Sequence, residues 1–140
     1  MKILPVTEKR FEHQGYPCVV LFMPMGHRCG YVGVPKTHRY YEFGYDEVAI
    51  DCHYGLNYAR NYLETQDDTE LWWFGFSCDH YGYKPDIDAI KKYYPDIPRL
   101  YERAMQVCFP EDIVRDTDFA VTQCVLIAEQ LKAMEVQHEV

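Results

Sequence analysis

The spacing of apolar residues changes along this chain, and this change constrains the fold more than any other feature. Short, almost wholly apolar runs rich in β-forming residues occur at 16–23 and 70–76, whereas after residue 116 apolar residues recur at helical spacing. Strands first and helices last favour an α+β fold over a parallel α/β fold. We therefore predict a small antiparallel sheet with a long C-terminal helix packed on one face.

The sheet is expected to contain a hairpin and a central strand. The predicted strands are Tyr16–Met23, Cys29–Val34, Glu47–His53 and Glu70–Phe76, with Asn57–Gln66 either a further strand or an irregular segment. The first two form the hairpin, because turn residues separate them and Pro35, which lacks a backbone donor, ends the second. Residues 66–69 are predicted to form a turn.

The C-terminal part is predicted to be helical. Asp86–Tyr94 and Ile97–Cys108 form two short helices, and a long helix begins at Asp116 or Thr117. The apolar face of the long helix comprises Ala120, Cys124, Ile127, Leu131 and Met134. We expect one globular domain over residues 1–140, with a sheet core at about 16–80 and a helical part at about 86–136.

Composition excludes several classes of protein. A net charge of −8 argues against binding duplex nucleic acid, which requires a basic face. No apolar run approaches the roughly 20 residues of a membrane-spanning helix. The six cysteines form no C-x-x-C pair, and no signal peptide precedes them, so we expect reduced thiols in a cytoplasmic protein.

Two histidine-bearing stretches, Ala49–Leu56 and Trp72–Gly82, mark the predicted site. Each is expected to run from an apolar strand into a turn, and a rigid strand holds polar groups at its end in place. The candidate ligand residues there are His53, Tyr54, Trp73, Asp79 and His80. The alternative is that these side chains only hydrogen-bond neighbouring loops.

Basic residues gather around the predicted hairpin. His27 and Arg28 lie at its turn, and Lys36 and His38 follow Pro35, in an otherwise acidic protein. A local positive region beside aromatic residues is typical of a site for a small anion such as a nucleotide phosphate. A solvated charged loop has the same composition, and both interpretations stay open.

A metal site is the second chemical interpretation. Asp51 and His53 would leave the same face of a strand, and with Asp79 and His80 they would supply enough ligands for a divalent metal. The spacing contains no H-E-x-x-H sequence and no closing C-x-x-C pair, so it matches no established motif.

These segments resemble a family of short, mostly uncharacterised phage and prophage proteins. The family pattern has G-Y-x-G-V-P followed by His, an H-G-G-L-T turn, W-W-x-G-F-D-C-x-H, and a C-terminal helix ending L-A-x-Q-L. The matching segments are Gly30–Pro35 with His38, His53–Asn57, Trp72–His80 and Ile127–Leu131. Departures fall on polar positions: Tyr54 replaces glycine, Asn57 replaces threonine and Ser77 replaces aspartate. The resemblance implies a viral origin, in the host cytoplasm, and no specific activity.

We therefore predict a phage-type accessory protein, more plausibly a binder than an enzyme. It would act against host defence by sequestering a small anionic, nucleotide-like ligand, with Arg28, Lys36 and His38 on phosphates and Tyr54 or Trp73 stacking. The 13 tyrosines favour a contact surface, hence a homo-oligomer. Two alternatives remain: a metal-dependent hydrolase, with a divalent metal as cofactor, and an inhibitor that binds a host defence protein directly.

Overall fold

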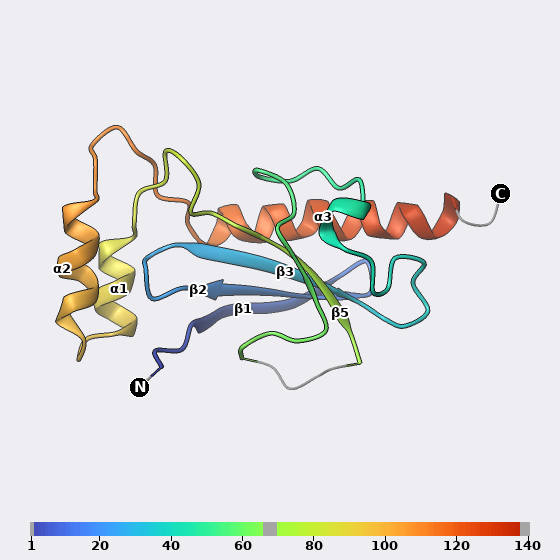
Figure 1. Cartoon of the computed structure of the whole chain (residues 1–140), viewed down its shortest axis with the longest axis horizontal. Helices are drawn as coiled ribbons and strands as arrows, with labels where there is room; N and C mark the ends of the chain where they lie inside the picture. Colours follow the sequence, from blue (N-terminus) through green and yellow to red (C-terminus); the bar gives the residue numbers. More distant parts are fainter. Residues whose placement is uncertain (1, 66–69, 138–140) are drawn as a thin grey trace.

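A five-stranded antiparallel sheet with a long helix on one face organises the protein (Figure 1). The computed structural model describes residues 2–65 and 70–137. The strands are β1 (Val6–His13), β2 (Tyr16–Phe22), β3 (Arg28–Val34), β4 (Tyr58–Arg60) and β5 (Trp72–Ser77), in the spatial order β1-β2-β3-β5-β4. The helices are η1 (Tyr45–Glu47), α1 (Ile87–Tyr93), α2 (Pro98–Gln106) and α3 (Thr117–Gln137). The predicted α+β class is confirmed.

Helix α3 covers one face of the sheet. Of the face that the helical spacing predicted, Ala120, Cys124, Ile127 and Leu131 are fully buried and Met134 is partly buried, and Ala128, which was not predicted, is fully buried as well. Asp116 caps the helix by accepting the backbone N–H of Phe119 at 2.8 Å. Gly30 lets the helix approach β3, because a Cβ atom there would lie 2.7 Å from the sulfur of Cys124 and 2.4 Å from the ring of Phe76. Among the described residues, no helix has both the length and the apolar content needed to span a membrane.

The opposite face of the sheet is also buried, which the sequence analysis did not anticipate. Val19, Leu21, Tyr31 and Trp73 point to this side and pack against Leu63, from the segment between β4 and β5. The three central strands are therefore apolar on both faces. This explains why β2 is a continuous apolar run instead of an alternating one.

Helices α1 and α2 form a separate layer at one end of the sheet (Figure 1). They pack together and against Phe22, at the end of β2. The β2–β3 turn lies beside α1, and only glycine fits at its tip: Gly26 has φ +100°, and a Cβ atom there would lie 2.9 Å from both Pro85 and Ile90. The turn that carries His27 is thus packed against the helical layer.

Most of the predicted elements are confirmed, one predicted strand is wrong, and one strand was not predicted. The hairpin, the central strand and all three helices lie where the sequence predicted them. Strand β1 was not predicted, because its charged residues hide the alternation and a bulge interrupts it between Thr7 and Lys9. Of the Asn57–Gln66 segment only Tyr58–Arg60 is a strand, β4. The turn predicted at residues 66–69 lies outside the described residues.

The strand predicted at Glu47–His53 is wrong. This segment follows η1 without regular structure, and the position beside β5 belongs to β4. Its backbone instead binds side-chain amides of α3: Gln130 accepts the N–H of Asp51 at 2.8 Å, and Gln123 accepts the N–H of His53 at 2.8 Å. Two glutamines thus provide the partners that a neighbouring strand would otherwise supply.

Arg28 is the centre of a buried ion-pair network. Its guanidinium donates to Glu8 at 2.8 and 3.1 Å and to Asp86 at 2.7 Å, and it lies 4.7 Å from the ring centroid of Phe22. Tyr93 and Thr117 also donate to Glu8. Although burial opposes ionisation, the bonds from Arg28 hold the pKa of Glu8 below its ordinary value.

Replacing Arg28 by methionine should strongly destabilise the fold. Glu8 would lose its charge partner in a buried position, which costs about 3–5 kcal/mol of unfolding free energy, measured by urea denaturation at pH 7. Lys36→Met is the matched control, since its exposed ammonium pairs with Glu70 on the surface. If Arg28→Met lowers the unfolding free energy no more than Lys36→Met does, Arg28 is not the centre of a stabilising ion-pair network.

Candidate functional site

Two loops form the framework of the site. The loop after β5, residues 78–85, runs beside residues 107–116, which connect α2 to α3. The backbone N–H of Ile113 donates to Gly82 O at 2.9 Å, and the N–H of Lys84 donates to Ile113 O at 2.7 Å. These bonds form a short parallel bridge between Tyr83 and Ile113. The two loops are therefore held as one unit, although about 30 residues separate them in sequence.

A tight turn carrying His53 and Tyr54 completes the framework. Tyr54 has φ +58° and Gly55 has φ +78°, and the turn closes with a bond from Gly55 N–H to Cys52 O. The ring of Tyr54 stacks on that of His80, with centroids 4.4 Å apart and planes 17° apart, and its hydroxyl donates to Tyr81 O. Both predicted histidine stretches thus reach the same place.

An inner pocket of about 280 Å³ lies where the three segments meet. Its lining consists of His53, Tyr54, His80, Tyr81, Gly82, Tyr83, Glu111, Asp112, Ile113 and Arg115. The guanidinium of Arg115 lies 4.7 Å from the ring centroid of Phe119, which also contacts the edge of His53. The pocket therefore combines an arginine, two imidazoles and two carboxylates with aromatic walls.

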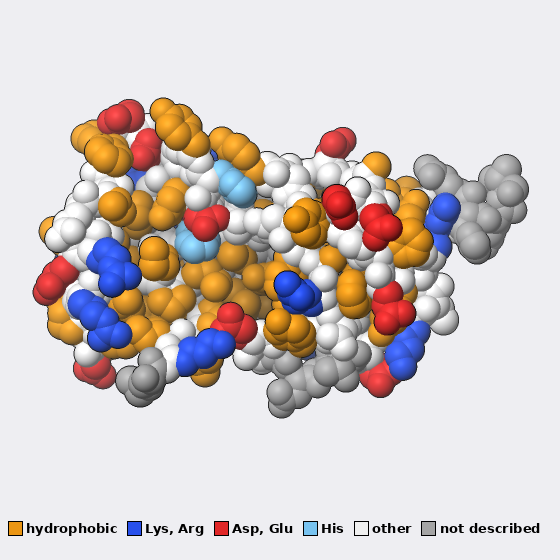
Figure 2. Space-filling model, in the orientation of Figure 1, with side chains coloured by type: hydrophobic (Ala, Val, Ile, Leu, Met, Phe, Trp, Pro, Cys, Tyr) orange, Lys and Arg blue, Asp and Glu red, His pale blue; other side chains and the backbone are white. Residues whose placement is uncertain are grey.

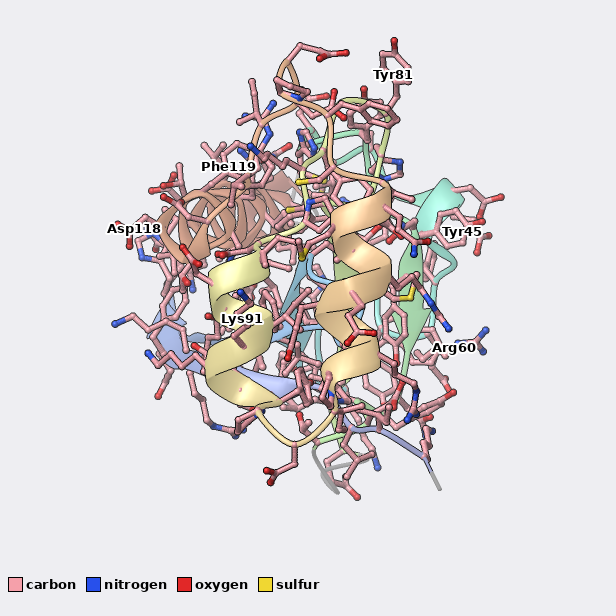
Figure 3. All side chains as sticks on the ribbon, turned by 90° about the vertical axis from the view of Figure 1, so that its left-hand side faces the viewer. Tyr45, Arg60, Tyr81, Lys91, Asp118 and Phe119 are labelled. Atoms are coloured by element: carbon pink, nitrogen blue, oxygen red, sulfur yellow. The ribbon has the colours of Figure 1, made fainter. Side chains whose placement is uncertain are left out.

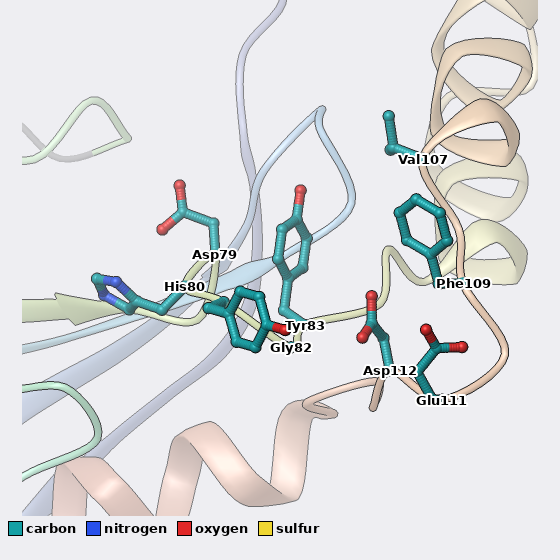
Figure 4. A pocket seen from close by; sticks show the side chains of 9 residues that line it. Asp79, His80, Gly82, Tyr83, Val107, Phe109, Glu111 and Asp112 are labelled. Carbon is teal, nitrogen blue, oxygen red and sulfur yellow. The ribbon is translucent and has the colours of Figure 1, made fainter.

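An outer cavity of about 410 Å³ adjoins the inner pocket and shares the loop 80–83 with it. Figure 4 shows the ring of Tyr83 across this cavity from Phe109 and Val107, with the carboxylates of Glu111 and Asp112 below them. Asp79 also lines the cavity. The outer cavity is thus richer in carboxylates than the inner pocket, and it lacks Arg115.

A chain of polar contacts runs from β4 to the hairpin turn. Asn57 donates to the hydroxyl of Ser77 at 2.9 Å, and Ser77 donates to Asp79 at 2.7 Å. The second carboxylate oxygen of Asp79 lies 3.7 Å from Nε2 of His27, whose ring edge faces Tyr83. These contacts hold Asp79 and His27 beside the loop that lines both cavities.

The surroundings keep two imidazoles neutral and Asp79 charged. Burial lowers the pKa of His27, an effect that the neighbouring Asp79 opposes without reversing it. Burial and the charge of Arg115 lower the pKa of His53. The pKa of Asp79 is lowered even though burial acts against it, because Ser77 donates to its carboxylate and His27 is near. Near pH 7, therefore, the inner pocket combines the fixed positive charge of Arg115 with a neutral imidazole at His53.

The thiol and hydroxyl of the β5 end are not activated nucleophiles. Burial raises the pKa of Cys78 to about 12, so its thiol stays protonated at neutral pH. The Ser77 hydroxyl donates a hydrogen bond to Asp79, a carboxylate whose lowered pKa makes it a weak base. Among the described residues of this site, neither Ser77 nor Cys78 is hydrogen-bonded to an imidazole.

Five of the predicted ligand residues lie together. His53, Tyr54 and His80 line the inner pocket, Asp79 and His80 line the outer cavity, and His27 contacts Asp79 from the hairpin turn. The strand argument that joined them was incorrect for His53, which lies in a turn. Its position follows instead from the bond between its backbone and Gln123.

The structure places the other four predicted ligand residues elsewhere. Arg28 is buried in its ion pairs with Glu8 and Asp86. Trp73 is fully buried on the second face of the sheet, because the alternation of β5 directs it away from α3. Lys36 and His38 follow the far end of β3, where Lys36 pairs with Glu70 and the Nε2–H of His38 donates to Leu131 O at 3.0 Å. None of the four lines the inner pocket.

The proposed metal ligands are also divided. Asp51 lines a shallow depression beside Leu126 and Gln130 on α3, whereas Asp79 and His80 line the outer cavity. Within residues 2–65 and 70–137, no group of three or more His, Cys, Asp or Glu side chains has a metal-binding arrangement. Nδ1 of His27 and Nε2 of His80 are buried and lack a hydrogen-bond partner among the described residues.

The sequence analysis missed the contribution of the α2–α3 connection. Arg115, Glu111, Asp112 and Phe109 all come from it. One signal was present: the run V-C-F-P-E-D-I-V-R mixes bulky apolar residues with charges and lacks the glycines of an ordinary surface loop.

Comparisons of this chain with protein-family models, with curated proteins and with solved structures find no match. The predicted likeness to phage proteins therefore stays a prediction, and the site is interpreted from its own geometry.

Protonation of His27 should weaken the fold below pH 6.5. Because the folded pKa of His27 lies below its ordinary value of 6.5, the unfolded chain binds the proton first. The stabilisation contributed by neutral His27 is therefore fully present above pH 6.5. Below that pH, the unfolding free energy falls by up to about 1.4 kcal/mol per pH unit until the pH reaches the pKa of His27 in the folded protein. Urea denaturation at pH 7.5, 6.5 and 5.5 measures this slope.

The double variant His27→Gln/His53→Gln is the control, since His53 titrates in the same direction. We expect it to flatten the slope in this range. Protonation of Glu8 lowers the unfolding free energy only below pH 4.5, the ordinary pKa of a glutamate, so it does not affect the slope in this range. An unchanged slope in the double variant would contradict the assignment.

Proposed function

We propose that this protein binds a small nucleotide-like ligand in the inner pocket and carries out no chemistry on it. The observation that supports this most directly is the stacked pair of Tyr54 and His80 beside Arg115. Tyr54 is 60% exposed, so the ring face opposite His80 can receive a planar base. Base stacking on an exposed aromatic ring contributes about 1–3 kcal/mol per base.

Arg115 is the proposed phosphate contact. Its guanidinium carries a permanent charge and two parallel donors, which suit a phosphate better than a lysine does. His53 lies next to it, as the effect of Arg115 on the pKa of His53 indicates. Arg115 thus takes the role that the sequence analysis gave to Arg28, Lys36 and His38.

Glu111 and Asp112 are the proposed ribose and base contacts. Carboxylates accept hydrogen bonds from ribose hydroxyls and from exocyclic amino groups. They would also repel a ligand with several phosphates, because a single arginine offsets them in the inner pocket. We therefore favour a nucleoside monophosphate, or a cyclic nucleotide with one charge per phosphate.

A binder fits the chemistry of the site better than an enzyme does. The thiol of Cys78 is protonated at neutral pH, and the base that accepts from Ser77 is Asp79, whose lowered pKa makes it a weak one. Together with the predicted likeness to phage proteins, this supports an accessory protein that sequesters a nucleotide signal of host defence, in the cytoplasm and as a homo-oligomer.

Thermal-shift measurements with linear and cyclic mononucleotides test the proposal. A ligand that binds only the folded state raises the melting temperature by mass action. Arg115→Gln should weaken binding about tenfold or more, because it removes a charge-assisted contact. Lys36→Gln is the matched control and should leave the shift unchanged. If no nucleotide raises the melting temperature, the proposal fails.

Proton uptake provides a second readout. A phosphate beside His53 would raise the pKa of its imidazole, so binding near pH 6.5 should take up a proton. Calorimetry in buffers of different ionisation enthalpy detects this uptake, and His53→Gln should abolish it. Nucleotide binding without proton uptake would place the phosphate away from His53.

The metal-dependent alternative is supported by the two unpartnered imidazole nitrogens of His27 and His80. Metal analysis of the purified protein tests it. A stoichiometric transition metal that is lost in His80→Ala would favour the hydrolase over the binder.

A further inference from the structure

A third cavity extends the outer cavity toward the helical layer. It has a volume of about 200 Å³, and its lining consists of Pro24, Met25, Tyr83, Leu100, Arg103, Ala104 and Val107. Tyr83 and Val107 line both this cavity and the outer one. The two cavities therefore form one groove, which we call the docking groove, with an acidic end at Glu111 and an end at Met25 that is apolar apart from Arg103.

Bulky apolar side chains are exposed along this groove. Met25 is 52% exposed, Val107 50%, Phe109 54% and Tyr81 97%. Figure 2 shows hydrophobic side chains gathered over the loops that follow β5 and α2, and in Figure 3 Tyr81 projects beyond the rest of its loop. Exposed apolar residues on a protein surface usually occur singly, so a contiguous cluster of them indicates an interaction site.

The charge at one end of the groove selects the chemistry of the occupant. Asp79, Glu111 and Asp112 line the acidic end. Glu111 and Asp112 form no ion pair with any other described residue, and Asp79 contacts only His27 and Ser77 through its side chain. The whole chain carries a net charge of −8. Complementary charge would therefore be positive.

A second copy of this chain is a poor occupant. A two-fold symmetric contact with its axis near Glu111 and Asp112 would bring the carboxylates of both copies together. Like charges in a desolvated contact of this kind cost several kcal/mol. A different, basic partner avoids this repulsion.

The backbone of the groove is not free to pair with an added strand. The N–H of Lys84 and Ile113 and the carbonyls of Gly82 and Ile113 already bond across the two loops. Recognition must therefore come from side chains. We infer that the docking groove binds a segment of another protein in which a bulky apolar side chain lies close to lysine or arginine. The apolar side chain enters between Met25 and Val107, and the basic group lies at Glu111 and Asp112.

Selection from a library of random peptides of about twelve residues, displayed on phage, tests this inference. We expect the enriched peptides to share an aromatic or large aliphatic residue within a few positions of lysine or arginine. Val107→Asp and Phe109→Ser should each weaken a selected peptide about tenfold or more, because such anchors dominate interface energetics. The double variant Glu111→Lys/Asp112→Lys should do the same.

Matched controls are Leu126→Ser, which changes an exposed apolar residue on α3, and Glu12→Lys, which reverses a charge on the edge strand β1. Both should leave peptide binding unchanged. Enriched peptides that are acidic, that bind equally well to Val107→Asp, or that bind through the control positions would overturn the inference, as would the absence of enrichment. Sedimentation showing a dimer that Val107→Asp dissociates would instead assign the groove to a second copy and overturn it.

This inference shares Glu111 and Asp112 with the proposed ligand site, but other residues separate the two proposals. Val107 and Phe109 do not line the inner pocket, so Val107→Asp and Phe109→Ser should keep the full nucleotide response. Arg115→Gln should in turn keep peptide binding, since Arg115 does not line the docking groove. Failure of one proposal is therefore distinguishable from failure of the other.

Discussion

The ion-pair network of Arg28 is the interaction on which the rest of the molecule depends. Glu8 and Asp86 bind its guanidinium from β1 and from the cap of α1, so one side chain joins the sheet to the helical layer. The same residue anchors both ends of the loop that lines the site: its carbonyl accepts the N–H of Cys78 at 2.9 Å, and its side chain binds Asp86. A residue expected to bind a ligand instead positions the loop that lines both cavities. Its charge is fully engaged in doing so, because a buried guanidinium requires carboxylate partners.

The second constraint is the use of α3 as a scaffold for irregular backbone. The segment that carries His53 has no neighbouring strand, and side-chain amides of Gln123 and Gln130 satisfy its backbone groups. Such tethers fix a turn in space without continuing the sheet, so the turn can bend toward the loop after β5. The stacking of Tyr54 on His80 depends on that bend. The geometry of the site thus comes from helix-to-loop bonds as much as from strand ends.

The site separates two kinds of chemistry over a short distance. The inner pocket holds Arg115 and the imidazole of His53, which burial keeps neutral, whereas the docking groove runs from the carboxylates of Glu111 and Asp112 to a mainly apolar end that also holds Arg103. The two loops that are bonded through Tyr83 and Ile113 line both regions. A charged ligand and an apolar side chain therefore meet different surfaces of one rigid unit. The neutral state of His53 leaves it able to accept or donate a proton as its surroundings change.

By itself the sequence determined the class of fold, the hairpin, the central strand and the buried face of α3, because continuous apolar runs and helical periodicity are local signals. It also indicated that the His53 and His80 stretches belong to one site. Only the tertiary structure decided the remainder. The edge strand β1 carries almost no apolar pattern and exists through its pairing with β2. Arg28 stabilises the fold instead of binding a ligand, because the fold brings it together with Glu8, which precedes it in the chain, and with Asp86, which follows it. Arg115 reached the site through a single pair of loop bonds, and contacts between residues so far apart leave no trace in local spacing.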